Sequence, residues 1–221
     1  MCRKRWRLAS RAAYSGRMHF HSFSLKNWHR WLLVALFAIA MAWMESATVF
    51  YLRAKLERLE PNQTNPLPHP APVGVLSFGN IEITREAATL TMLLIVGWLA
   101  GRNTRTRWAY RLVAFGVWDV FYYVFLWPMS GWPRTLWDWD VLFLIPLPWW
   151  GPVLAPVLIA LLMVLGGTLI SQFDSDARPL WPQRLSLSLN FLGVGVALYA
   201  FMADAIAVLL KWRQRRGRAN D

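Results

Sequence analysis

The chain has 221 residues, of which 56% are hydrophobic, and it still carries a formal net charge of +12. A soluble domain of this size rarely combines such an apolar composition with such a high charge, so the charges must be separated from the apolar stretches. A single cysteine, Cys2, excludes an intrachain disulfide and a CxxC redox or zinc site. Membrane topology alone explains the basic residues, and we expect no nucleic-acid partner.

Residues 1–30 form a basic tail without a single acidic residue. Because Lys and Arg are retained on the cytoplasmic side of membranes, this tail predicts a cytoplasmic N-terminus. Aromatic residues lie between the basic ones. The tail is therefore either an amphipathic helix on anionic lipid headgroups or an ordinary solvated segment. No small-x-small cleavage site follows the first apolar run, so we expect it to be a retained helix rather than a signal peptide.

About 20 mostly apolar residues are needed for a helix to cross the hydrocarbon core of a bilayer. The sequence predicts an all-α, polytopic transmembrane bundle (residues 31–210) of five spans, with six as the alternative. An outer loop over 53–83, rich in proline, follows the first span, and a basic C-terminal tail covers 211–221. The five predicted spans are 31–52, 84–101, 108–127, 153–170 and 185–210.

The segment 134–152, ahead of the fourth span, is apolar but contains Pro146, Pro148 and Pro152. Proline inside a helix removes a backbone hydrogen bond and clashes with the preceding turn. We therefore expect a short interfacial helix or a re-entrant segment, which protein or a watery cavity must cover. The segment is also rich in tryptophan, which favours a position at one membrane interface over a ligand cage.

The basic residues after the second predicted span, from Arg102 to Arg111, indicate a cytoplasmic turn, in agreement with the N-terminal tail. The basic residues after Leu210 would also prefer the cytoplasm, although five spans place them outside. A short sixth span over 136–150 would remove this conflict. Length and proline content favour five spans, in a membrane of the bacterial inner-membrane type.

Acidic residues inside the predicted spans are the strongest functional signal, because ionisable groups in a membrane are costly. Asp119 falls near the middle of the third span and Glu45 about two thirds of the way across the first. Glu86 and Asp204 fall toward the outer side. Together with Asp140, Tyr122 and Tyr123, these residues are the candidates for an outer polar cluster, and the sequence predicts no basic partner inside the spans.

Three interpretations of this cluster remain open. Protonated acids can hydrogen-bond between helices as structural contacts. They can instead form a proton or cation pathway, or bind a hard metal ion through oxygen. The first is favoured, so no metal is assigned.

Motifs narrow the function without selecting it. All four histidines lie outside the spans, which excludes a b-type haem site, and no phosphate-binding or hydrolase motif occurs. We expect no cofactor. The sequence favours a non-enzymatic accessory subunit, with partner membrane subunits, or a small-ligand binding module. A small transporter or channel is the alternative, and a membrane enzyme with an outer carboxylate site is the second alternative.

Overall fold

The computed structural model describes residues 25–55, 78–175, 180 and 182–218. Most of the N-terminal tail, residues 56–77 of the predicted outer loop and the last three residues lie outside these ranges, and so do the predictions made for them. The described elements, in chain order, are α1 (Leu25–Lys55), α2 (Phe78–Ala100), α3 (Thr104–Ser130), β1 (Trp139–Phe143), β2 (Trp149–Pro152), α4 (Leu154–Phe173) and α5 (Arg184–Arg218).

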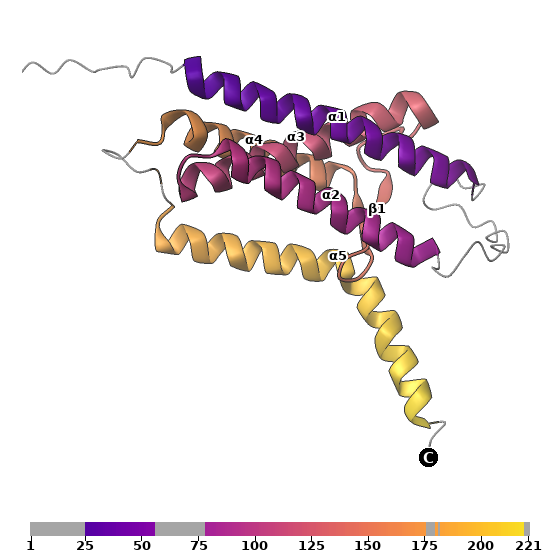
Figure 1. The fold of residues 1–221 in the computed structure, drawn as a ribbon. Coiled ribbons are helices and arrows are strands. Elements are labelled where there is room, and N and C mark those ends of the chain that lie inside the picture. Colours follow the sequence, from indigo (N-terminus) through magenta and orange to yellow (C-terminus); the bar gives the residue numbers. More distant parts are fainter. Residues whose placement is uncertain (1–24, 56–77, 176–179, 181, 219–221) are drawn as a thin grey trace, which may run out of the picture.

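Five helices within the described ranges are long and apolar enough to cross a membrane. Each coincides with one predicted span, and most continue past the predicted ends, because a helix does not stop where its apolar residues stop. Figure 1 shows α1 to α4 lying together and α5 set apart from them. A multi-pass membrane protein is compatible with these lengths and compositions.

Helix α3 is the centre of the molecule and packs against α1, α2 and α4. Small side chains allow these close contacts. Ala38 and Ala42 of α1 and Ala114 of α3 are completely buried in the main core cluster. Without a hydrophobic driving force between helices in lipid, such close backbone approach is a main source of helix association.

Glycines mark the tightest crossings of α3. A Cβ atom on Gly97 of α2 would lie 2.5 Å from the backbone nitrogen of Arg111, and one on Gly167 of α4 would lie 2.5 Å from the carbonyl oxygen of Ala109. Gly97 and Gly101 form a GxxxG pair, the spacing that places two small residues on one helix face. The helix pairs α2–α3 and α3–α4 therefore depend on the absence of side chains at these positions.

Both ends of α3 are fixed by local chemistry. Asn103 caps its start, because the side-chain oxygen accepts a hydrogen bond from the Thr106 backbone N–H while the Thr106 hydroxyl accepts one from the Asn103 N–H. Gly131 ends the helix with φ of 70°, a left-handed conformation that glycine adopts at little cost. The short α2–α3 turn is thus well defined.

The segment before α4 is a β-hairpin, so the prediction of a short helix there is wrong. Strands β1 and β2 pair antiparallel, with Asp140 opposite Gly151. The prolines that exclude a helix leave an extended backbone, whose N–H and C=O groups are satisfied by the second strand. The ring of Phe143 packs against the rings of both Phe115 and Trp118 of α3, so the hairpin packs onto the bundle.

The sixth span is also contradicted. The backbone N–H of Val153 donates to the carbonyl of Asp138, and that of Leu154 donates to the carbonyl of Leu136. The chain therefore enters and leaves the hairpin at the same place, and residues 136–150 cannot cross a bilayer.

Helix α5 makes few contacts with the rest of the molecule. Its main contact is with β2, where the ring of Phe201 lies against Gly151. None of the side chains along its apolar stretch is buried inside the molecule. The second half of α5 turns away from the other helices (Figure 1).

Candidate functional site

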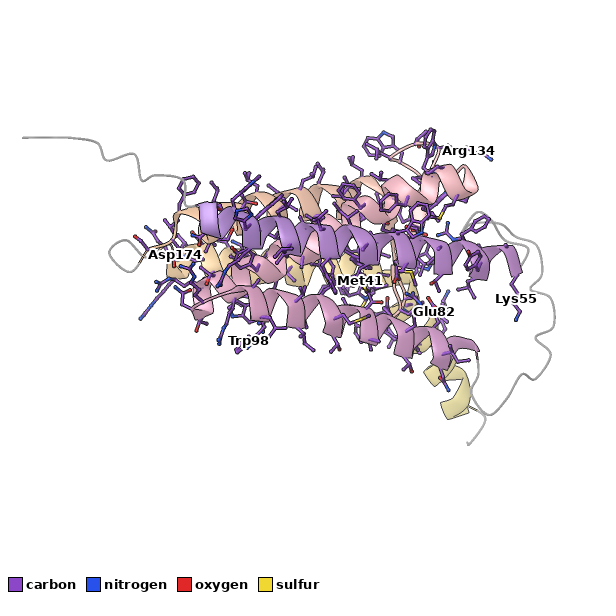
Figure 2. The ribbon with its side chains drawn as sticks, turned by 45° about the horizontal axis from the view of Figure 1, so that its top comes forward. Met41, Lys55, Glu82, Trp98, Arg134 and Asp174 are labelled. Carbon is purple, nitrogen blue, oxygen red and sulfur yellow. The ribbon has the colours of Figure 1, made fainter. Side chains whose placement is uncertain are left out.

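A cavity of about 260 Å³ lies where α1 ends, α2 begins and the hairpin enters the bundle. Glu82, which lines it, lies toward the same end of the molecule as Lys55, whereas Asp174 lies at the opposite end (Figure 2). The lining side chains come from α1, α2, α3, β1 and the residue after β1: Glu45, Val49, Leu52, Arg53, Glu82, Arg85, Glu86, Thr89, Trp118, Asp119, Tyr122, Tyr123, Asp140, Val141, Leu142, Phe143 and Leu144.

Helical periodicity explains why these residues share one cavity. Residues three or four apart lie on the same helix face, and the lining residues have this spacing: Glu45, Val49, Leu52 and Arg53 on α1, and Glu82, Arg85, Glu86 and Thr89 on α2. On α3, Asp119, Tyr122 and Tyr123 also have this spacing and share one face. The hairpin adds a fourth wall that the helical pattern alone does not contain.

Arg85 is the basic partner that the sequence analysis overlooked. Its guanidinium forms ion pairs with Glu45 of α1 and Glu82 of its own helix, and the second pair measures 2.6 Å. The Thr89 hydroxyl donates to the other Glu45 carboxylate oxygen at 3.2 Å. Although Arg85 falls one residue inside the predicted span 84–101, its long side chain reaches along the helix to the acids. The expectation of acids without a basic partner is therefore wrong for Glu45.

A second ion pair joins α1 to the hairpin. Arg53 Nη2 lies 2.9 Å from Asp140 Oδ1, and both side chains are almost completely buried, at 12% and 1% exposure. The Arg53 guanidinium also lies over the ring of Trp132, 4.4 Å from its centroid. Trp132 itself is buried, so this tryptophan does not contribute to an aromatic belt.

The pKa of Asp140 is raised to about 6, because burial disfavours the charged carboxylate more than Arg53 and the Val141 N–H stabilise it. Its Oδ1 atom accepts hydrogen bonds from Arg53 and from the Val141 backbone, whereas its buried Oδ2 atom has no hydrogen-bond partner of good geometry among the described residues. The Tyr123 hydroxyl also stabilises the charged form of Asp140, and both residues line the cavity.

Glu86 holds the hairpin against α2. The backbone N–H of Leu144 lies 3.0 and 3.1 Å from the two carboxylate oxygens of Glu86. Leu144 follows β1 directly, where the paired strand no longer supplies an acceptor, so Glu86 replaces the missing ladder partner. This carboxylate therefore has a structural contact as well as a place in the cavity wall.

The Asp119 side chain forms neither an ion pair nor a hydrogen bond among the described residues, unlike the other acids of the cavity. It is 7% exposed, and its buried Oδ2 atom has no hydrogen-bond partner in the part of the chain that the structure describes. Tyr122 and Tyr123 lie one turn further along α3, and both line the same cavity. A buried polar atom without a partner is costly, and in native proteins it commonly marks a functional position or an unseen partner.

The structure brings together six of the seven residues proposed from the sequence and separates the seventh. Asp204 is exposed on α5 and does not line the cavity; the main contact of α5 is with β2, where Phe201 lies against Gly151. Sequence reasoning missed Arg53, Arg85, Thr89 and Trp118. The four-residue spacing from Glu45 to Val49 to Arg53 was the signal that could have identified Arg53.

The cavity is acidic overall, since five carboxylates line it against two guanidinium groups. Trp118, Tyr122, Tyr123 and Phe143 supply aromatic faces between these charges. Such a combination of excess negative charge and π-faces suits a positively charged molecule. Among the described residues, no three Asp, Glu, His or Cys side chains are placed so that they could share a metal ion.

Comparison of the chain with known protein families, with curated proteins and with solved structures gives no match.

Proposed function

We propose that this chain is a membrane module that binds a small, positively charged organic ligand in the acidic cavity. The observation that carries the proposal is that five carboxylates line one cavity against two guanidinium groups, and that two of them, Asp119 and Asp140, have an Oδ2 atom with no hydrogen-bond partner among the described residues. An ammonium ion with N–H groups can donate hydrogen bonds to carboxylate oxygens, and its positive charge offsets the excess negative charge of the cavity.

The size of the cavity limits the ligand. About 260 Å³ is slightly below the range of about 300–1,000 Å³ that is typical of pockets for drug-sized molecules. The aromatic side chains of Trp118, Tyr122 and Phe143 favour an ammonium group with small apolar substituents. A simple alkyl ammonium ion is therefore a suitable probe.

Calorimetric titration of the full chain in phosphatidylcholine nanodiscs with methylammonium, which carries both N–H donors and an apolar methyl group, tests the proposal. We expect saturable binding that Asp119→Asn weakens at least about tenfold, because a buried cation loses its nearest uncompensated charge. Asp204→Asn is the matched control, since it removes the same charge from an exposed site outside the cavity. The proposal fails if the wild-type chain binds no ammonium ion, or if both variants bind as it does.

A second candidate function is proton or cation transport, which the same two oxygens favour. Asp119 and Asp140 come from different elements, line one cavity and interact electrostatically. A proton or small cation could therefore pass between them. In proteoliposomes with an imposed pH gradient, this function predicts a flux that Asp119→Asn and Glu45→Gln abolish while Asp204→Asn retains it. Binding without flux would assign the cavity to ligand recognition alone.

We further propose a cytoplasmic N-terminus, with the acidic cavity on the outer side of a bacterial-type inner membrane. The basic residues around the α2–α3 turn support this orientation. Five crossings then place the C-terminus outside. A periplasmic reporter fused after Asp221 should be active, and a cytoplasmic reporter at the same position should not be. The opposite result would contradict the orientation.

A further inference from the structure

A second cavity, of about 320 Å³, lies at the opposite end of the bundle. The start of α1, the end of α2, the α2–α3 turn and the end of α4 enclose it, and none of its residues lines the acidic cavity. Its lining residues are mostly polar: Asn27, Arg30, Ala100, Arg102, Asn103, Thr106, Tyr110, Ser171, Asp174 and Ser175. Arginines outnumber acids in this described lining, whereas acids outnumber arginines in the acidic cavity.

Asp174 is the one acid among the described residues of this lining, and its carboxylate already accepts hydrogen bonds from three groups. The Asp174 side chain is completely buried, and its carboxylate accepts hydrogen bonds from Arg105 Nε at 2.8 Å, from the Leu180 backbone at 2.9 Å and from the Asn103 amide at 3.3 Å. These bonds also hold its pKa below the usual range, although burial alone would raise it. Its negative charge is therefore compensated by Arg105, which does not line the cavity.

Two arginines of this lining, Arg30 and Arg102, form no ion pair with any described carboxylate. Arg30 is held in place by one hydrogen bond, from Nη1 to the carbonyl oxygen of Ala100 at 2.9 Å. Arg30, Arg102 and Tyr110 line the same cavity. The Asn27 side-chain amide adds a donor that no described residue accepts.

We infer that this cavity binds a phosphate group. A phosphate monoester carries up to two negative charges, which match the positive charges of Arg30 and Arg102, and its oxygens accept the paired N–H donors of a guanidinium group. Nearby, Arg107 and Arg111 stack on Trp98, and Arg111 also stacks on Trp108. Arginine and tryptophan pairs of this kind are typical of the headgroup level of a membrane. The phosphate can therefore come from a lipid headgroup or from a free phosphate compound.

Two measurements on the full chain distinguish these sources. In the first, inorganic phosphate is titrated calorimetrically into the chain in phosphatidylcholine nanodiscs, with acetate titrated in parallel. In the second, native mass spectrometry counts the phosphatidic acid and phosphatidylcholine molecules that the detergent-released chain retains. Binding in the first measurement indicates a free phosphate compound, and selective retention of phosphatidic acid in the second indicates a lipid. Either result supports the inference.

Arg102→Gln is the decisive variant, because its side chain is exposed and has no described protein partner, so the fold should not depend on it. We expect it to weaken phosphate or phosphatidic acid binding about tenfold, the loss of one charge-assisted interaction. Arg184→Gln is the matched control, since it removes an exposed arginine at the start of α5, at the same end of the molecule, outside the cavity (Figure 1). Absence of binding in both measurements, equal binding of acetate, or equal losses in the two variants would overturn the inference.

Discussion

The adjacent glycines of α4 offer a sharp test of the helix packing. A Cβ atom on Gly167 would lie 2.5 Å from the carbonyl oxygen of Ala109 and 2.9 Å from a methyl group of Val113, whereas one on Gly166 would meet nothing within 4 Å. The first contact is with the α3 backbone, which cannot rotate away. Gly167→Ala must therefore move α4 away from α3, and Gly166→Ala need not.

The magnitude follows from two effects with opposite signs. Replacing glycine by alanine inside a helix stabilises it by up to about 1 kcal/mol in either position. Inserting a methyl group into a closely packed contact costs about 1–3 kcal/mol. We therefore expect Gly166→Ala to raise the free energy of unfolding slightly and Gly167→Ala to lower it, with a difference of about 1–3 kcal/mol between the variants.

Unfolding of each variant in mixed micelles of dodecyl maltoside and sodium dodecyl sulfate, followed by tryptophan fluorescence and circular dichroism, provides the measurement. The comparison is internally controlled, because the two substitutions are identical and adjacent. Equal stabilities, or a more stable Gly167→Ala variant, would show that α3 and α4 do not approach as closely as described and would refute the reasoning.

The ion pairs give three further predictions. Arg85→Gln leaves Glu45 without its ion-pair partner and should lower the free energy of unfolding in the micelle assay by about 1–3 kcal/mol, a value reduced because the Arg85 side chain is 24% exposed. Adding Glu45→Gln should recover part of this loss. If the losses of the two single variants simply add, Arg85 and Glu45 do not form the pair. Arg53→Gln removes the charge that lowers the pKa of Asp140, so this pKa should rise above about 6 and the carboxyl should be protonated at pH 7. Infrared titration measures this change, and the Asp140 band is assigned as the one that Asp140→Asn removes. An unchanged titration would argue against the Arg53–Asp140 contact. Because the pKa of Asp140 rises from 3.8 to about 6 on folding, its protonated form is favoured in the folded state, and stability should fall by on the order of 3 kcal/mol as the pH rises from about 4 to about 6. Asp140→Asn should remove this dependence, and a stability independent of pH in the wild-type chain would show that the carboxyl is not buried.

Hydrophobic length was sufficient to locate the helices, because a run such as 153–170 has few structural alternatives in a membrane protein. The hairpin could not be predicted in the same way. Proline explains why 146–152 is not helical, but the hairpin is held against α3 by the contacts of Phe143 with Phe115 and Trp118, which are tertiary contacts with no local signal. The sequence also gives no sign that α5 is bent and weakly packed, because its apolar stretch resembles those of the other four helices.

The candidate site could be predicted in part. The depths of the acids along the predicted spans indicated an outer polar cluster, and the structure places Glu45 and Asp119 in one cavity. Its electrostatics depend on long side chains that reach across elements. Arg85 and Arg53 lie toward the ends of their helices, where basic residues normally contact headgroups. Only the four-residue spacing from Glu45 through Val49 to Arg53 indicated that Arg53 shares the face of the acid. Asp204 illustrates the opposite error, since depth along a helix does not determine which way the side chain faces.

The central place of α3 has a consequence for the order of assembly during synthesis. Helices α1 and α2 are made first, yet they contact each other little apart from the polar contacts of Glu45 with Arg85 and Thr89. A nascent chain that ends at Ala100 therefore lacks the helix on which both of its spans pack. The smallest fragment with a shared interface runs through Ser130, and chains truncated before that point should be the preferred substrates of membrane quality control.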